Sequence, residues 1–200
     1  DDEIVNLMDF NCDQKNDVHF FYTLPFNKNT ALIETTWLSN LEDQSLMDYD
    51  LQLENYIKNN LGIKNYKINF IEKGAIPLFY PGFNNDNKTI NIGSAGGMTR
   101  LSTGYTFLNI QEHSKYIVKN IDKTEKIKVY NIGRKYLFLD KIFLKVLKNH
   151  PEKMPKIFFN MFKTSSNTVI KFLSNKSNIF EDIKIISKMP KLIFMKALFY

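Results

Sequence analysis

The order of apolar and polar positions divides the chain into strands followed by helices. Apolar and β-branched residues dominate five runs that we predict to be strands: 4–10, 18–26, 30–38, 66–72 and 89–93. The polar segment Asn27-Lys28-Asn29 lies between the second and third runs. Such a segment is typical of a tight turn, so these two runs are predicted to form a hairpin.

Apolar residues at spacings of three and four predict helices elsewhere. The first prediction starts near Asp43 and ends at Gly62, which is typical of a C-cap. Its apolar side contains Leu46, Tyr49, Leu53, Tyr56 and Ile57. Further helices are predicted from Thr103 to Lys119 and over nearly all of the chain from Tyr136 onward, where 149–155 (NHPEKMP) separates the first two.

This order predicts an α+β fold, with a mixed or antiparallel sheet followed by a helical C-terminal region. The chain is predicted to divide into three parts. They are a sheet with one helix (1–92), a glycine loop with its helix (93–120), and a basic helical region (121–200).

Glu34 interrupts an otherwise apolar predicted strand, TALIETTW. If the hairpin is symmetric about Lys28, Tyr22 lies directly opposite Glu34. Both faces of the strand are largely apolar, so we expect the carboxyl group to be buried. A buried carboxyl group stays protonated nearer to neutral pH, as a general acid requires. The alternative is an ion pair with a Lys or Arg across the sheet.

Glu72 is a second candidate acid, because it ends the predicted strand 66–72. A solvated strand end is the alternative interpretation. Nothing in the spacing connects Glu72 with Glu34.

A glycine-rich loop, GSAGGMTRLSTGY, follows the last predicted strand. Ser102 and Thr103 are the candidate N-caps of the next helix. Free N–H groups and the positive end of a helix dipole favour anionic ligands. The spacing matches neither a Rossmann GxGxxG nor a P-loop, and a purely structural turn remains the alternative.

Charge is unevenly distributed along the chain. Residues 121–200 contain 17 Lys and Arg against 6 Asp and Glu, whereas 1–120 contain 10 against 15. A basic half suits an anionic surface, either nucleic acid or membrane. The lysines are spread along amphipathic helices without a base-reading motif, which argues against nucleic acid. The helix at 136–148 has one apolar and one lysine side, and either packs in the core or lies on a bilayer.

The cysteine content and the length of the apolar runs limit the class of protein further. The single cysteine, Cys12, excludes an internal disulfide framework and fits a reducing cytoplasm. No apolar run reaches the ~18 to 20 residues that span a bilayer.

Several segments in this order resemble the flavin-dependent lycopene cyclases of carotenoid synthesis. They are LMDF (7–10), FFYTLPF, ALIETTWLS, EKGAIPL, IGSAGGMTRLSTGYTF, FLKVLKNHPEKMPKIFFNMF and KFLSN. The resemblance implies a fold related to the flavoprotein monooxygenases, with an FAD/NAD(P)-binding domain interleaved with a substrate sheet. The family's amino-terminal GxGxxG does not occur here, so we expect the carboxy-terminal portion of a longer enzyme.

The resemblance also implies reduced FAD as cofactor and NAD(P)H as its reductant. The residues expected to line the flavin are Gly93, Ser94, Ala95, Gly96, Gly97 and Met98. Those expected to bring the helix start to it are Ser102, Thr103, Gly104 and Tyr105. Leu101 stands where relatives often have proline.

The family's catalytic acid lies in a motif that reads Ile33-Glu34-Thr35-Thr36 here. Glu34 is therefore the expected acid, helped by Tyr22, while Thr35 replaces a second acid common in bacterial relatives. The implied reaction converts a ψ end group of lycopene into a β-ionone ring without net redox change. Glu34 itself or Glu72 is the candidate base for the last proton.

The resemblance further implies a cytoplasmic protein, peripherally attached to the inner membrane, where its substrate is dissolved. Two alternatives remain open. One is another flavoprotein of the same fold, such as a hydroxylase or prenyl reductase. The other is a basic membrane-binding module without catalysis.

Overall fold

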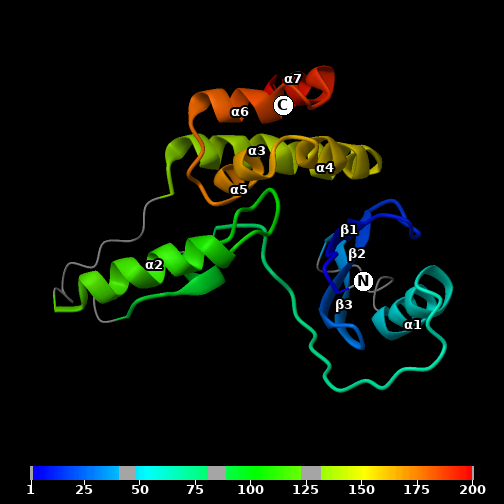
Figure 1. Ribbon diagram of the computed structural model, residues 1–200. Coiled ribbons are helices and arrows are strands. Elements are labelled where there is room, and N and C mark those ends of the chain that lie inside the picture. Colours follow the sequence, from blue (N-terminus) through cyan, green and yellow to red (C-terminus); the bar gives the residue numbers. More distant parts are fainter. Residues whose placement is uncertain (1, 41–47, 81–88, 123–131, 200) are drawn as a thin grey trace. The chain divides into compact units, whose positions relative to one another are not determined.

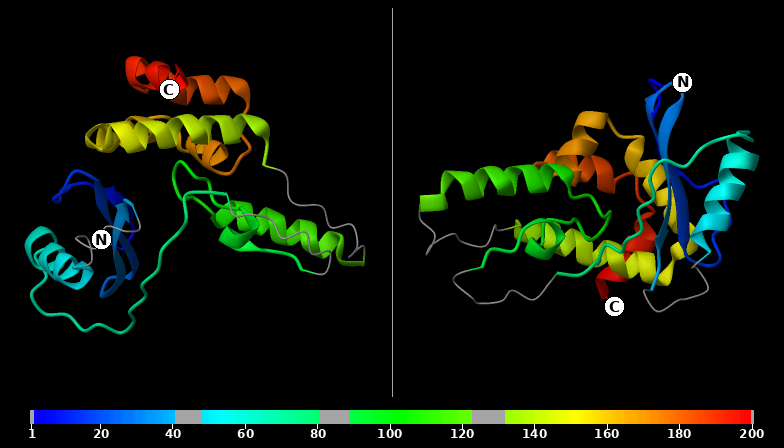
Figure 2. Two further views of the ribbon diagram at one scale, coloured as in Figure 1. Left: turned by 180° about the vertical axis from the view of Figure 1, so that it is seen from behind. Right: turned by 90° about the horizontal axis from the view of Figure 1, so that it is seen from below.

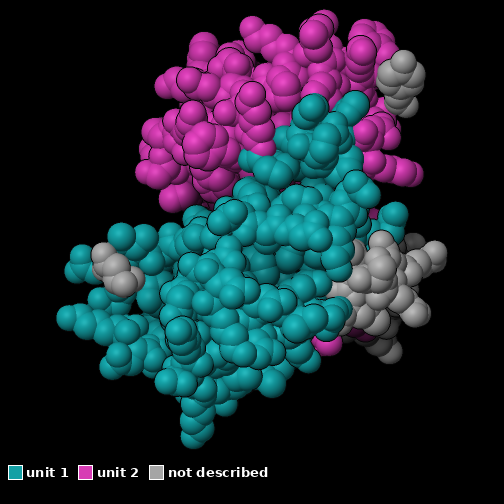
Figure 3. Space-filling model, turned by 90° about the vertical axis from the view of Figure 1, so that its right-hand side faces the viewer, with its two compact units in different colours: residues 1–72, 150–155 teal, residues 73–149, 156–200 magenta. Residues whose placement is uncertain are grey.

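The structure is a computed structural model that describes residues 2–40, 48–80, 89–122 and 132–199. The chain forms two compact units (Figures 1 and 3). Unit 1 consists of Asp1–Glu72 with His150–Pro155, and unit 2 of Lys73–Asn149 with Lys156–Tyr200. The mixture of a small sheet and many helices agrees with the predicted α+β class.

Unit 1 contains an antiparallel sheet of β1 (Asn6–Asp9), β2 (Val18–Asn27) and β3 (Thr30–Leu38), in that order. The predicted hairpin is confirmed, and Tyr22 pairs with Glu34 as expected. In the turn, the side-chain oxygen of Asn27 accepts a hydrogen bond from the Asn29 amide at 2.9 Å. This local bond is typical of Asn in turns and helps to fix the register.

One face of the sheet is covered by α1 (Tyr49–Asn55) and the π-helical segment η2 (Tyr56–Asn60). The Tyr56 ring stacks on Phe21 with 3.9 Å between centroids. Its hydroxyl group donates to Asp9 Oδ2 at 2.7 Å. Gly62, with φ +70°, follows the helical segment, as the predicted C-cap requires. Leu46, at the start of the predicted helix, lies outside the described residues.

The predicted strands 66–72 and 89–93 are wrong, because the described parts of both have no strand structure and Gly93 begins a 3₁₀ turn. The side chains of Ile68, Phe70 and Ile71 are exposed. An alternating pattern indicates which side of a strand is apolar, but a strand forms only where a partner supplies its ladder of hydrogen bonds. No described strand pairs with either segment.

The helices from Phe107 onward, which lie in unit 2 apart from the first two residues of α4, confirm the predicted helical C-terminal region (Figure 2). In chain order they are α2 (Phe107–Lys119), α3 (Arg134–Asn149), α4 (Met154–Phe162), α5 (Ser166–Leu173), α6 (Ile179–Ile186) and α7 (Lys191–Phe199). The predicted break falls between α3 and α4, at a 3₁₀ turn over Pro151–Lys153. Proline at its first position is favourable because no helical N–H is lost there.

Helix α3 packs in the core of unit 2. Phe143 is buried and lies 5.6 Å from Phe158 and 6.2 Å from Phe194 between ring centroids. Val146 is buried, and Lys145 Nζ donates to the carbonyl group of Ala197 on α7 at 3.2 Å. The interpretation of this helix as core-packed is therefore confirmed.

His19 is the buried polar centre of unit 1. Its ring stacks on Trp37, with 3.9 Å between centroids and 12° between planes. Nδ1 lies 2.9 Å from the Asp13 carbonyl oxygen, and Nε2 lies 2.8 Å from the Thr35 hydroxyl oxygen. Burial lowers the pKa of His19, although the Asp13 carbonyl opposes that shift.

The lowered pKa of His19 predicts that the folded protein is less stable in acid. Unfolded His19 takes up its proton near pH 6.5, whereas the folded side chain takes it up only at lower pH. The stabilising contribution is therefore present above pH 6.5 and is lost as the pH falls below it. We expect the midpoint of thermal unfolding to fall between pH 7.5 and 5.5, and to fall less in His19→Gln.

The exposed Phe26 supplies the control, because Phe26→Ser changes no titratable group and should keep the slope of the unmodified protein. Some slope should survive in His19→Gln, since burial also lowers the pKa of His113. Equal slopes in His19→Gln and the unmodified protein would contradict the assignment to His19.

Candidate functional site

Glu34 lies on β3 and is exposed, so the expectation that it is buried is wrong. The reason is that α1 covers the opposite face of the sheet, where Thr35 and Trp37 both donate hydrogen bonds to Gln52 Oε1. One oxygen of Glu34 accepts a hydrogen bond from the Thr36 hydroxyl group at 2.8 Å. The alternative also fails within the described residues, where no Lys or Arg forms an ion pair with Glu34.

Tyr22 lies beside Glu34 on the same face of the sheet. Its ring meets Phe20 edge to face, with 5.2 Å between centroids. Burial, and then the charge of Glu34, raise the pKa of Tyr22 to about 12. The hydroxyl group therefore remains protonated over the whole physiological range. The face formed by Tyr22, Leu24, Leu32, Glu34 and Thr36 is hereafter called the acid face.

Thr35 points away from Glu34, because successive side chains of a strand alternate between faces. Its hydroxyl oxygen lies 2.8 Å from His19 Nε2 and 3.2 Å from Gln52 Oε1. An acid at this position would therefore lie behind the strand rather than beside Glu34. The Thr35 substitution leaves the immediate surroundings of Glu34 unchanged.

Glu72 is exposed in a segment without secondary structure. The interpretation as a solvated residue is confirmed, although not at a strand end. No described contact joins Glu72 to Glu34.

The first half of the glycine loop is a compact 3₁₀ turn, η3 (Gly93–Gly96). The amides of Gly96, Gly97 and Met98 all donate to carbonyl groups of the loop itself. A Cβ atom on Gly96 would lie 2.5 Å from the Asn91 carbonyl oxygen, so only glycine fits there. These residues are buried and form a self-contained turn, while Ser94 and Ala95 lie nearer the surface.

The second half of the loop differs from prediction. Ser102 and Thr103 do not cap α2, which begins at Phe107 with Thr106 at its N-cap. The amides of Thr103 and Gly104 both donate to the Arg100 carbonyl group, at 3.2 and 2.8 Å. Gly104, with φ +71°, then redirects the chain before the helix. An extra turn therefore separates the serine and threonine from the helix start.

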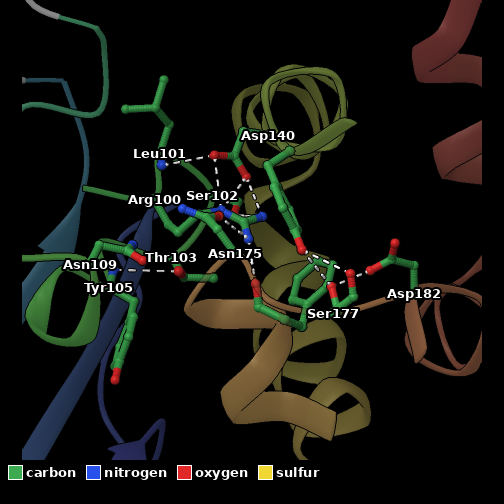
Figure 4. A network of polar contacts seen from close by, with 12 residues as sticks. Arg100, Leu101, Ser102, Thr103, Tyr105, Asn109, Asp140, Asn175, Ser177 and Asp182 are labelled. Carbon is green, nitrogen blue, oxygen red and sulfur yellow. Dashed lines mark hydrogen bonds and ion pairs between the residues drawn. The ribbon is translucent and has the colours of Figure 1, made fainter. Parts of the chain in front are cut away.

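Arg100 and Asp140 form a buried ion pair that sequence reasoning missed (Figure 4). Their side chains are 1% and 0% exposed. Arg100 Nη2 donates to Asp140 Oδ1 at 2.7 Å, and Nε lies 3.1 and 3.2 Å from the two carboxylate oxygens. The available signal was an acid within the apolar helix segment YLFLDKIFL, which resembles the signal at Glu34.

The remaining donors of Arg100 are also satisfied. Nη1 donates to the Phe172 carbonyl at 2.5 Å and to Asn175 Oδ1 at 3.2 Å. Nη2 lies 3.5 Å from the buried Ser102 hydroxyl, so Ser102 faces this ion pair. The Tyr136 and Phe172 rings lie 5.0 and 4.8 Å from the guanidinium carbon.

Leu101 donates its amide hydrogen to Asp140 Oδ2 at 3.1 Å. Proline has no amide hydrogen, so the residue often found here in relatives cannot make this bond. The Leu101 amide therefore gives Asp140 a second partner from the glycine loop, beside Arg100.

The loop is open beside two of its glycines. Among the described residues, chain neighbours apart, no atom lies within 4 Å of an added Cβ on Gly104, and around Gly93 the nearest atom is Ile110 Cδ1 at 3.9 Å. The Thr106 hydroxyl donates to the Gly104 carbonyl and so does not cap the first turn of α2. The edge formed by Ser94, Gly104, Tyr105 and this helix start fits an anionic cofactor such as a flavin.

Within the described parts of the chain, no group of three or more His, Cys, Asp and Glu side chains is arranged to hold a metal ion. Among the same residues, no helix is long and apolar enough to cross a membrane.

The fold and the site together define an α+β protein with an acid on a sheet face and a glycine loop at a helix start. A family model described as lycopene cyclase protein matches residues 1–198. The chain therefore belongs to the lycopene cyclase family, which indicates a role in carotenoid cyclisation. No curated protein and no solved structure matches the chain.

The buried ion pair gives a stability prediction. Asp140→Asn leaves the Arg100 charge buried without its counter-charge, and breaking such a pair costs about 3–5 kcal/mol. We expect denaturant unfolding to shift to correspondingly lower denaturant concentration. Glu112→Gln is the control, since Glu112 forms surface ion pairs with Lys115 and Lys176 and should leave the midpoint unchanged. Similar midpoints for the two variants would refute this role of Asp140.

Proposed function

We propose that the protein acts as a lycopene β-cyclase in which Glu34 donates the proton that starts ring closure. The observation that carries the proposal is the position of Glu34, opposite Tyr22 on the sheet face that α1 leaves uncovered. The family match over residues 1–198 supplies the chemical context.

Protonating an alkene makes strong demands on the acid, because an isolated double bond is a very weak base. The acid must be neutral, oriented and shielded from water. Glu34 is exposed, so its desolvation has to come from the substrate. Leu24 and Leu32 pair across the two strands on the acid face and offer an apolar surface to a polyene.

The proposed reaction needs no oxidant, because one proton is added to the substrate and one is later released. The proton from Glu34 adds to the terminal double bond, the resulting carbocation is attacked by a second double bond, and a ring C–C bond forms. Loss of a ring proton then gives the β end group. The acceptor is Glu34 after donation, or Glu72.

Reduced FAD, with NAD(P)H as its reductant, is the cofactor that we propose. When bound, it would supply negative charge of the kind that stabilises a carbocation. The residues that would hold it are Ser94, Gly104 and Tyr105, with the N–H groups at the start of α2. The buried Gly96, Gly97 and Met98 would support this edge from behind.

The test is to express the complete reading frame in cells that accumulate lycopene and to identify the pigments by chromatography. We expect carotenes with one or two β-ionone rings from the unmodified protein and a loss of at least tenfold in Glu34→Gln. Glu54→Gln is the matched control, because Glu54 lies on α1, pairs with Lys58 and should leave the product unchanged.

The outcomes of this experiment distinguish the possible functions. Unchanged lycopene from a folded protein would refute the cyclase and favour another flavoprotein or a non-catalytic module. Full activity in Glu34→Gln would refute the acid role alone. Loss of activity in Glu72→Gln, with Glu34→Gln equally inactive, would identify Glu72 as the base.

We also propose that the protein attaches peripherally to an anionic membrane through α6 and α7. Large apolar side chains are exposed along both helices: Ile179, Phe180, Ile183, Ile186, Leu192, Met195, Leu198 and Phe199. Exposed lysines accompany them at positions 184, 188, 191 and 196. The acids of α6 are neutralised, because Glu181 pairs with Lys171 and Asp182 with Lys135. Such a surface suits anionic lipids.

Vesicle flotation tests this surface. We expect several-fold more binding to phosphatidylcholine vesicles containing phosphatidylglycerol than to phosphatidylcholine alone, and weaker binding at high salt. Phe180→Ser should reduce binding, whereas Phe26→Ser, which changes an exposed hairpin residue in unit 1, should not. Equal binding of both vesicle types, or equal effects of both variants, would contradict the proposal.

A further inference from the structure

A polar cluster lies directly behind Glu34, on the face of β3 that packs against α1. It joins Gln52 of α1 to the side chains of Thr35 and Trp37, and both of these residues also contact His19. The acid mechanism uses none of these four residues. They nevertheless surround the strand segment that carries Glu34.

The donor and the acceptor of each hydrogen bond in this cluster follow from which atoms carry a hydrogen. Trp37 Nε1 can only donate, so the atom of Gln52 that lies 2.9 Å away must be its carbonyl oxygen. The Asp13 carbonyl can only accept, so His19 carries its proton on Nδ1 when neutral. His19 Nε2 is then an acceptor, and the single Thr35 proton is shared between it and Gln52 Oε1.

This arrangement fixes β3 from one side. Residues 35 and 37 are held to α1 by Gln52, and Trp37 is held flat against His19. A strand that slipped by one residue would place Glu34 on the α1 side, so these contacts also define the face to which Glu34 belongs. On the other face, the contacts of Glu34 within the described residues are the hydrogen bond from the Thr36 hydroxyl and the neighbouring Tyr22.

We propose that Gln52 is a positioning residue for Glu34. Its carbonyl oxygen anchors Thr35 and Trp37 and thereby holds the Glu34 carboxyl group at the place where the alkene must meet it. Gln52 lies behind the sheet and does not touch the acid face, so its effect is on orientation. A displacement of about 1 Å in a catalytic group lowers turnover by up to ~10²-fold. This inference rests on the proposed acid role of Glu34.

Two substitutions separate positioning from packing. Gln52→Met keeps the size of the side chain but removes the acceptor, whereas Gln52→Glu keeps an acceptor for both donors. We expect Gln52→Met to lower kcat by roughly ten- to hundredfold with KM nearly unchanged, and Gln52→Glu to stay within about threefold of the unmodified protein. Gln111→Met makes the same change on the exposed side of α2 and serves as the control.

A spectroscopic readout is independent of activity. The indole N–H resonance of Trp37, assigned by its loss in Trp37→Phe, should move upfield in Gln52→Met because its hydrogen bond is gone, and should keep a bonded position in Gln52→Glu. Trp37 is the single tryptophan of the sequence.

The outcomes distinguish this inference from the proposed function. If Glu34→Gln is inactive but Gln52→Met keeps its kcat while losing the Trp37 hydrogen bond, the positioning role is wrong and the acid role stands. If Glu34→Gln is fully active, both fail. A rise in KM at constant kcat would assign Gln52 to substrate binding instead and overturn the inference.

Discussion

The buried ion pair between Arg100 and Asp140 is the constraint on which unit 2 depends. Moving two charges out of water costs several kcal/mol for each ion, and only close to complete hydrogen bonding offsets that cost. Here the guanidinium group contacts a carboxylate, a backbone carbonyl, an amide oxygen and a hydroxyl group. These partners come from the glycine loop, α3 and the end of α5, so the path of the loop follows from the ion pair.

This constraint separates the glycine loop into two parts with different roles. Residues 96–102 are buried and are shaped by their own backbone bonds and by Arg100. The outward edge, from Gly104 to the start of α2, has space beside Gly104 and a helix start without a side-chain cap. In the proposed function, a cofactor would meet this edge, which the buried part of the loop holds in place. The resemblance implies that the whole loop lines the flavin, whereas our proposal uses only its outward edge.

What the sequence predicted well is local. The hairpin register follows from a three-residue turn and from the alternation of side chains, and the C-terminal helices follow from their spacing. The predictions of strands at 66–72 and 89–93 are wrong, because a strand forms only beside a partner strand, and that partner can be far away in the chain. The Arg100–Asp140 pair joins residues 40 positions apart, and no local pattern encodes that contact. The exposure of Glu34 was also unpredictable, since two apolar faces do not reveal which one a helix covers.

The exposure of Glu34 changes how its chemistry has to be understood. A carboxyl group in water is ionised at neutral pH and cannot protonate an alkene. A polyene lying on Leu24 and Leu32 would exclude water and offer no hydrogen bonds, which favours the neutral form of a carboxyl group beneath it. Tyr22 remains a neutral donor under the same conditions, because its pKa is raised to about 12. Under the proposed function, substrate binding and activation of the acid would be one event, which would restrict the reactive acid to the moment when an alkene is present.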